Sequence, residues 1–221
     1  MTTVITAAPS AHRRTLLLGL ACAATLPLLQ GCFPIAATGA VAGAALFADR
    51  RTSGAYVEDE GIEWRTRSRL RERFGNSVNT SVVSYNRNVL ITGQAPNEQT
   101  REEIGRIAAG VENVRGIINE VEVAGLSSLS SRSNDAMITS MVKARFVDDQ
   151  RFAANHVKVV TEAGTVFLMG IVTRDEGDAA TEVARTTQGV QKVVRVFEYV
   201  DPAEATHLDQ RGGSNPPQND E

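Results

Sequence analysis

The chain has little of the chemistry that catalysis or metal binding requires. Its 221 residues include only three histidines and two cysteines. His12 lies near the N-terminus and His207 near the C-terminus, so His156 is the only histidine within the patterned part of the sequence. One histidine without a free thiol beside it cannot supply a catalytic triad or a set of metal ligands. We therefore predict no catalytic residue, no metal site and no cofactor.

Long hydrophobic runs are also absent. The longest, from Thr15 to Leu29, follows Arg13 and Arg14 and has the length of a signal-peptide core. It is too short to span a bilayer, which takes about 20 residues. Cys22 lies within this run and would be removed with it, which leaves Cys32 as the only thiol of the mature chain. A disulfide within the mature chain is thereby excluded.

The residues that end this run resemble a bacterial lipobox. Leu29-Gln30-Gly31-Cys32 places a small residue before a cysteine, which in a lipobox becomes the acylated N-terminus. By the sorting rule for lipoproteins, an Asp directly after the cysteine prevents transfer to the outer membrane. Phe33 stands at that position instead, which implies transfer to the outer membrane. An ordinary secretory signal with an incidental cysteine is the alternative. The pair Arg13-Arg14 also resembles a twin-arginine signal, so the export route stays open.

Positive charge is scarce once the signal is removed. Loss of Arg13 and Arg14 leaves 21 basic residues against 26 acidic ones, a net charge of −5. A mature chain this acidic is a poor match for nonspecific binding to nucleic acid.

The sequence does contain an internal repeat, in which one pattern of residues occurs twice. Val89-Leu90-Ile91-Thr92-Gly93 is followed 77 residues later by Val166-Phe167-Leu168-Met169-Gly170 in the same local setting. Around each copy, apolar periodicity predicts a helix, a hairpin of two strands, a second helix and a last strand. The predicted fold is α+β, with two small αββαβ modules. Modules of about 65 residues bury too little surface to be stable alone, so we expect them to pack together.

The expected elements follow from local signals. In the first module we predict a helix over 59–74 with Asp59 as N-cap, a hairpin of 81–85 and 88–92, a helix capped by Asn97, and a strand over 117–123. In the second we predict a helix from 134 or 135, a hairpin of 157–161 and 165–169, a helix opened by a Thr173/Glu176 capping box, and a strand over 193–200.

These elements give a division of the whole chain. We predict a lipoprotein signal peptide over 1–31, an acylated Cys32 with a membrane-proximal tether over 32–57, a first module over 58–125, a Ser-rich linker over 126–133, a second module over 134–201 and a disordered tail over 202–221.

The first helices of the two modules differ on one flank. Aligning Phe74 with Phe146 pairs Arg65, Arg69 and Gly75 of the first helix with Met137, Met141 and Val147 of the second. Apolar residues on a helix outside the stripe that faces the core mark a contact surface for a membrane, a ligand or a partner. Packing of this flank against the first module explains the same pattern and stays open.

The first helix carries five arginines, of which Arg65 and Arg69 are candidates for contact with anionic headgroups. Each cation near a charged surface contributes about 1 kcal/mol. The alternative is a solvated face that Glu63 and Glu72 partly neutralise.

With the lipobox, the two αββαβ modules and a Gly at the end of each middle strand, the chain resembles lipoproteins with tandem BON domains. The resemblance is carried most specifically by residues 157–173. It implies a non-enzymatic protein at the periplasmic face of the outer membrane, which binds anionic phospholipid such as phosphatidylglycerol through its second BON domain and supports envelope integrity. It also implies lipid contacts at Met137, where the family has an aromatic residue, at Val147 and at Gly170. The alternative is a periplasmic adaptor whose same apolar flank binds envelope or division proteins.

Overall fold

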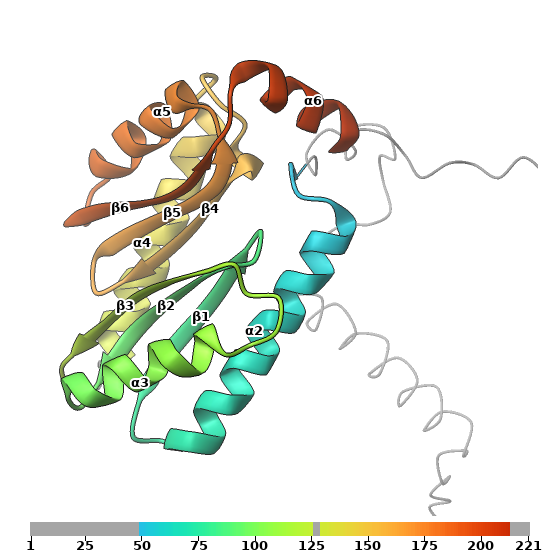
Figure 1. Cartoon of the computed structure of the whole chain (residues 1–221). Helices are drawn as coiled ribbons and strands as arrows, with labels where there is room; N and C mark the ends of the chain where they lie inside the picture. Colours follow the sequence, from blue (N-terminus) through green and yellow to red (C-terminus); the bar gives the residue numbers. More distant parts are fainter. Residues whose placement is uncertain (1–48, 126–128, 213–221) are drawn as a thin grey trace, which may run out of the picture. The chain divides into compact units, whose positions relative to one another are not determined.

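The computed structural model of the chain describes residues 49–125 and 129–212 (Figure 1). The first module consists of α2 (Ser53–Phe74), β1 (Asn79–Tyr85), β2 (Asn88–Ala95), α3 (Glu98–Ala109) and β3 (Gly116–Val123). The second consists of α4 (Leu129–Asp148), the 3-10 helix η3 (Ala154–His156), β4 (Val157–Glu162), β5 (Thr165–Val172), α5 (Arg174–Arg185) and β6 (Lys192–Tyr199), and α6 (Pro202–Gly212) follows it. The predicted α+β fold of two αββαβ modules is confirmed. The predicted signal peptide and Cys32 lie outside the described residues.

Each module forms a three-stranded mixed sheet in which the middle strand pairs with both others. β1 and β2 are antiparallel, as are β4 and β5, and the last strand of each module runs parallel to the middle one. Thr80 pairs with Gly93 in the first sheet and Val157 with Gly170 in the second, so the spacing of 77 residues holds in three dimensions. The parallel pairing requires a crossover, which α3 and α5 supply.

A separate core lies between each sheet and its two helices. In the first module the core holds Ile62, Leu70, Val82, Val89, Ile91, Ala95, Ile104, Ala108, Val111 and Val121. In the second it holds Ile138, Val142, Phe146, Phe152, Val157, Val159, Val166, Leu168, Val172, Ala179, Ala180, Val183 and Ala184. The four-residue spacing on the first helix of each module therefore marks its buried side, as predicted.

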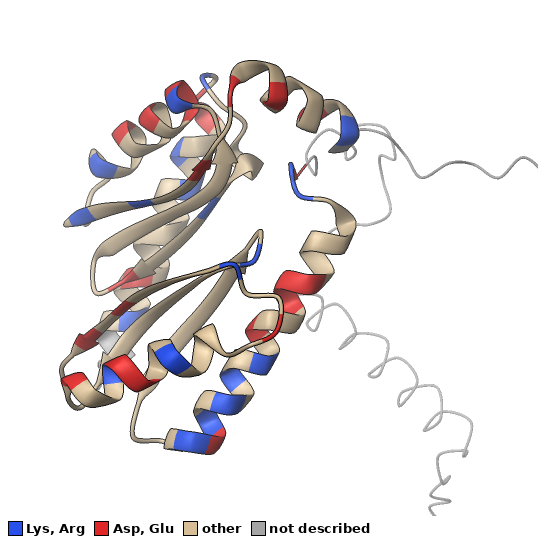
Figure 2. Cartoon of the chain, in the orientation of Figure 1, with Lys and Arg blue, Asp and Glu red and all other residues tan. Residues whose placement is uncertain are grey.

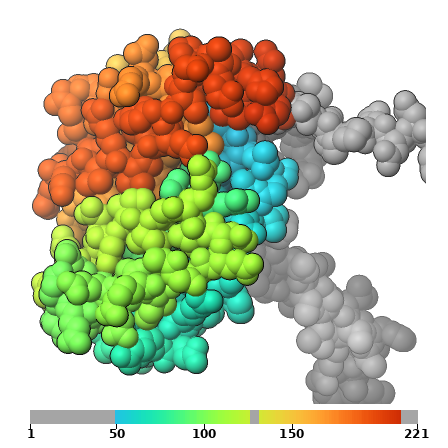
Figure 3. Space-filling view, viewed as in Figure 1, coloured from blue at the N-terminus to red at the C-terminus, as the bar shows by residue number. Residues whose placement is uncertain are grey.

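The opposite sides of the two sheets share a third apolar cluster. Tyr85 and Leu90 from the first sheet pack with Phe167, Met169 and Ile171 from the second, and all five are at most 5% exposed. In the space-filling view the green first module and the orange and red second module meet directly (Figure 3). The alternating residues of β2 and β5 thus serve two cores, which explains why both strands are almost wholly buried.

The starts of two helices differ from the sequence prediction. α2 begins at Ser53, because Thr52 and not Asp59 is its N-cap and accepts a hydrogen bond from Ala55 N at 3.1 Å. α4 begins at Leu129, within the predicted Ser-rich linker. Serine is only mildly unfavourable in a helix, so a helix with a packed continuation can extend through such a stretch.

The largest difference is α6, which lies where the sequence predicted a disordered tail. Asp201 caps the helix by accepting from Glu204 N at 2.9 Å. Ala205 is 4% exposed, and Leu208 packs against the cluster between the sheets. The composition of the tail does not reveal this helix, because its order comes from contacts with distant parts of the chain.

Candidate functional site

The outer side of α4 carries an uncharged stripe. It consists of Met137, Ser140, Ala144 and Val147, whose spacing of three and four residues places them on one helix face. All four are exposed, and Met137 and Val147 are 62% and 73% exposed. The opposite side of the helix is buried in the core of the second module. We call these four residues the α4 stripe. Because its side chains are exposed, the alternative that this flank packs against the first module is wrong for Met137 and Val147.

Two other predicted lipid-binding residues lie elsewhere. Met141 is partly buried and packs against the core of the second module. Gly170 is buried in β5, and a Cβ added there would lie 2.4 Å from the carbonyl oxygen of His156. Gly93 occupies the same position in the first module, where a Cβ would lie 2.0 Å from the oxygen of Asn79. Both glycines therefore permit close approach of neighbouring strands, and the expected lipid contact at Gly170 gains no support from its position.

The predicted headgroup contacts on α2 are already engaged within the protein. Arg65 Nη2 lies 2.6 Å from Glu58 Oε1 in a salt bridge. Arg69 Nη1 donates to the carbonyl oxygen of Gly110 at 2.7 Å, which ties the C-terminal half of α2 to the end of α3. Both guanidinium groups are held by partners within the first module, so neither is free to define a binding surface on its own.

The structure corrects the alignment of the two first helices by one turn. Asp59 accepts hydrogen bonds from Asn86 N and Arg87 N in the first hairpin turn, at 2.8 and 2.7 Å. Asp135 does the same for the second turn, and accepts from Ala163 N at 3.0 Å and Gly164 N at 2.9 Å. These two aspartates are therefore equivalent. The residues of α2 that correspond to Met137, Met141 and Val147 are Gly61, Arg65 and Arg71, and not Arg65, Arg69 and Gly75 as predicted.

The corrected alignment reveals a residue that the sequence interpretation overlooked. Trp64 is 68% exposed and stands on the outer face of α2, where α4 has Ser140. Val57, Gly61 and Ser68 share that face with it, at spacings of four, three and four residues. The spacing is present in the sequence, but the alignment of Phe74 with Phe146 did not place Trp64 opposite Ser140.

A second overlooked feature is the buried guanidinium of Arg50, which is 5% exposed as a residue. It donates to both carboxylate oxygens of Glu176, at 2.7 and 2.9 Å, and to both of Asp209, at 2.7 and 3.1 Å. Its Nη1 also donates to the carbonyl oxygen of Ile171 at 2.9 Å. His156 is buried beside them, with Nε2 3.5 Å from Asp209 Oδ1. We call Arg50, His156, Glu176 and Asp209 the Arg50 cluster.

Within the Arg50 cluster, Arg50 and Glu176 are held in their charged forms. Burial alone would lower the pKa of Arg50, but hydrogen bonds with Asp209 and Glu176 outweigh burial and raise that pKa. Burial alone would raise the pKa of Glu176, yet the neighbouring His156 ring and hydrogen bonds from Arg50 and Thr173 N hold that pKa well below its usual range. The cluster contains no nucleophile, and within residues 49–125 and 129–212 no group of three His, Cys, Asp or Glu side chains could hold a metal ion. It is a clamp between the segment at residue 50, α5 and α6.

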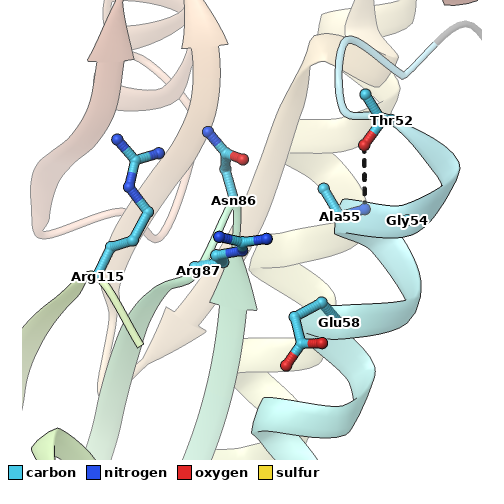
Figure 4. A pocket seen from close by; sticks show the side chains of 7 residues that line it. All are labelled: Thr52, Gly54, Ala55, Glu58, Asn86, Arg87 and Arg115. Carbon is cyan, nitrogen blue, oxygen red and sulfur yellow. Dashed lines mark hydrogen bonds between the residues drawn. The ribbon is translucent and has the colours of Figure 1, made fainter. Parts of the chain in front are cut away.

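A hollow of about 410 Å³ lies at the start of α2 (Figure 4). It is lined by Thr52, Gly54, Ala55, Glu58, Asn86, Arg87 and Arg115. Asn86 Nδ2 donates to Glu198 Oε2 at 2.7 Å, and Arg115 lies 3.9 Å from the same carboxylate. The hollow thus mixes both signs of charge and brings together no catalytic set.

Among residues 49–125 and 129–212, none of the helices has the length and apolar character needed to span a membrane.

Comparison with known proteins agrees with this geometry. The BON domain family matches residues 59–125 and 134–201, which cover the two αββαβ modules. The chain belongs to the BON domain family. Its two BON domains correspond to the first and second modules, and the resemblance predicted from the sequence is confirmed.

Several known proteins are similar to this chain over most of their length. The chain is 35% identical to Outer membrane lipoprotein DolP of Haemophilus influenzae over 175 residues, which is 78% of this chain and 91% of that protein. It is 38% identical over 154 residues to the 21 kDa hemolysin of Actinobacillus pleuropneumoniae, which is 69% of this chain and 79% of the relative. It is 28% identical over 144 residues to Osmotically-inducible protein Y of Escherichia coli, 63% of this chain and 72% of that one. The similarity to DolP supports an outer-membrane lipoprotein with two BON domains.

Proposed function

We propose that the protein is a non-enzymatic lipoprotein, anchored through an acylated Cys32 at the periplasmic face of the outer membrane, whose second BON domain docks on anionic phospholipid. The observation that carries the docking surface is the exposure of Met137 and Val147 on the uncharged α4 stripe, while the other side of the same helix fills a core. A helix with these two faces is suited to lie in the plane of a membrane interface.

The dimensions of the α4 stripe fit this role. Met137 and Val147 are ten residues apart, so the stripe is about 15 Å long at 1.5 Å per residue. Two large apolar side chains over that length are too few for a stable protein interface, which takes about 800 Å² from each partner. They are sufficient to add to a lipid anchor, since one acyl chain alone binds only marginally and a second signal makes binding stable.

Charges beside the stripe favour an anionic surface only modestly. Lys143 is exposed and makes no ion pair within the described structure. Arg145 is engaged, because its Nη1 donates to Val183 O at 3.0 Å and to Thr187 Oγ1 at 2.8 Å. Asp148, the last residue of α4, adds a negative charge at the end of the helix. Apolar insertion is therefore the main contribution that we propose for α4.

Vesicle flotation of the chain without its first 32 residues tests this proposal. All described residues lie after residue 48, so this form keeps every one of them. We expect it to float with phosphatidylglycerol vesicles and Met137→Glu to weaken binding more than tenfold, which corresponds to about 1.4 kcal/mol. Val123→Glu is the matched control, since Val123 is 50% exposed on β3 and lies outside the α4 stripe.

Two results would contradict the proposal. If Met137→Glu and Val123→Glu float as the unchanged chain does, the α4 stripe is not the contact. If the unchanged chain does not float at all, the BON domains do not bind this lipid. The proposed support of envelope integrity is tested separately by loss of the gene, which should make cells more sensitive to detergent, and a chain with Met137→Glu should restore resistance incompletely.

A further inference from the structure

The outer face of α2 carries the only tryptophan of the chain. Trp64 is 68% exposed, and Val57, two turns before it, is 70% exposed. Gly61 and Ser68 complete the face, so that a stripe without charge runs along the helix. We call Val57, Gly61, Trp64 and Ser68 the α2 stripe. Val57, Trp64 and Ser68 are exposed, whereas the Arg65 guanidinium lies over Gly61, where an added Cβ would be 3.0 Å from its Nη1. The buried side of α2 faces the core and β1.

Basic side chains gather beside the C-terminal end of this stripe. Between residues 64 and 74, α2 has five arginines and one glutamate. Figure 2 shows a mostly blue segment at the end of α2, where Glu72 is the one acidic residue, whereas the other acidic residues of the helix lie earlier. Arg71 lies closest to the outer face, and its guanidinium makes no hydrogen bond or ion pair within the described residues. Arg65, Arg67 and Arg73 form ion pairs with Glu58, Glu63 and Glu103, so the local positive charge rests on Arg69 and Arg71.

α3 extends this basic region. Arg69, Arg73 and Arg106 line a hollow of about 560 Å³ between α2 and α3, together with Glu72, Ile107 and Gly110. Arg106 is exposed and, like Arg71, has no ion pair in the part of the chain that the structure describes. Arg69 and Arg73 are engaged with Gly110 O and with Glu103, so Arg106 is the guanidinium that the hollow offers. It lies beside the apolar side chain of Ile107, and this combination suits the phosphate and glycerol backbone of a phospholipid.

We propose that the helical face of the first BON domain, centred on Trp64, is a second membrane-contacting surface that takes an anionic phospholipid leaflet. Trp64 enters the interface at headgroup level, and Arg71 and Arg106 meet lipid phosphates. This inference rests on the proposed function for the class of ligand, but not for the site, because the α4 stripe belongs to the other domain. Tryptophan prefers the boundary between headgroups and acyl chains, where its apolar ring and polar N–H are both accommodated.

The occupant is a lipid surface and not a protein for two reasons. Val57 and Trp64 are the two large apolar side chains of the α2 stripe, which is a smaller apolar area than a stable protein partner or a second copy requires. The second reason is the anchor, since α2 begins only 21 residues after Cys32. An extended chain of that length spans at most about 70 Å, so an acylated Cys32 would keep α2 at high local concentration near the leaflet.

Because the chain has one tryptophan, its emission reports on this surface without a label. The chain without its first 32 residues is mixed with vesicles of phosphatidylglycerol or phosphatidylcholine, and flotation and Trp64 emission are measured on the same samples. We expect a blue shift with phosphatidylglycerol, quenching when the acyl chains are brominated, and no shift with phosphatidylcholine or with soluble glycerol phosphate.

Matched variants separate the basic residues from general charge. Arg71→Gln combined with Arg106→Gln should reduce the emission change at a given lipid concentration at least fivefold. Arg185→Gln is the control, because Arg185 is exposed on α5 of the second domain and pairs only with Glu182. Thermal melting of each variant checks that the fold is intact.

The outcomes distinguish this inference from the proposed function. Flotation with unchanged Trp64 emission overturns the α2 surface and leaves the proposed lipid binding of the second domain standing. Failure to float overturns both. An equal blue shift with phosphatidylcholine overturns the role of the arginines, a shift with soluble glycerol phosphate points to a free anion, and a shift that depends on protein concentration without vesicles points to a second copy. Each of the last two also overturns the proposal.

Discussion

Arg50 and Glu176, 126 residues apart in the chain, form a two-pronged ion pair in which Nη1 lies 2.7 Å from Oε2 and Nη2 lies 2.9 Å from Oε1. Glu176 is also the residue whose side chain completes the capping box of α5 with Thr173. One carboxylate therefore joins the N-terminus of a helix in the second BON domain to the segment that precedes the first. Asp209 adds α6 to the same cluster.

Removal of the Arg50 charge should loosen this junction. Arg50→Met leaves two carboxylates without their cation, and breaking a buried pair from one side costs about 3 kcal/mol. We expect a loss of that order in the free energy of unfolding measured with urea, and faster proteolysis within α6. Arg185→Met, at an exposed pair with Glu182, should change stability by less than about 1 kcal/mol. Equal stability of the two variants would show that the Arg50 cluster is not a clamp.

The depressed pKa of Glu176 makes the contribution of this cluster depend on pH. A carboxyl group whose pKa is lower in the folded state stabilises the fold above its unfolded pKa, here 4.5, and loses that contribution as the pH falls through the folded value. The melting temperature of the unchanged chain should therefore exceed that of Glu176→Gln most at pH 6 to 7, and the difference should shrink as the pH falls below about 4. A difference that is constant from pH 7 to pH 3 would exclude this titration.

The shared apolar cluster predicts that the two BON domains unfold together. Leu90 is fully buried against residues of both sheets, and Leu→Ala substitutions in cores cost about 2 to 5 kcal/mol. Leu90→Ala should lower a single melting transition by several degrees while tryptophan emission, which reports on the first domain, and far-ultraviolet circular dichroism stay coincident. Two separated transitions in the unchanged chain would show that the domains fold independently.

The two sides of α4 should respond differently to the same charge. Val142 is fully buried, so Val142→Glu places an unpaired carboxylate in the core and should unfold the second domain. Met137→Glu places it on the exposed α4 stripe and should change the melting temperature by no more than about 2 °C. Melting curves of both variants test this difference between the two sides of α4. Early melting of Met137→Glu would mean that the side chain of Met137 is buried in solution.

Anchoring through Cys32 is tested by fractionation. Three acyl chains on one residue hold a protein on a membrane stably, since each buried methylene contributes about 0.8 kcal/mol. Cys32→Ala should move the protein from the membrane pellet to the soluble periplasmic fraction, or leave it attached only through an uncleaved signal. Mass spectrometry of the unchanged chain should find a lipid on residue 32. A mature N-terminus without lipid would make the predicted lipobox an ordinary secretory signal.

Local patterns in the sequence were sufficient for the repeat, the αββαβ order and both cores. The spacing of apolar residues depends only on helix and strand geometry, and therefore Ile138, Val142 and Phe146 were identifiable as core. The capping box at Thr173 and the helix stop at Gly75 are likewise short-range features. The BON resemblance followed from these signals because they occur twice at one spacing.

The tertiary structure alone decided which turn of α2 corresponds to which turn of α4. A four-residue period looks the same when it is shifted by four residues, so the sequence could not choose between two alignments. Asp59 and Asp135 establish the correct alignment, since each accepts hydrogen bonds from the two backbone N–H groups of its own hairpin turn. In this alignment Arg69 no longer corresponds to Met141, and Trp64, on the exposed face of α2, corresponds to Ser140 of α4.

Long-range contacts decided the remaining points for the same physical reason. α6 forms because Leu208 and Asp209 meet the sheet cluster and Arg50, which lies 159 residues before Asp209 in the chain. Gly170 is buried because the carbonyl group of His156, at the end of η3, approaches it, and Met141 is half-buried because α5 lies beside α4. Periodicity along the chain reports which side of an element is apolar. Only the packing of distant elements determines which part of that side remains exposed for a membrane.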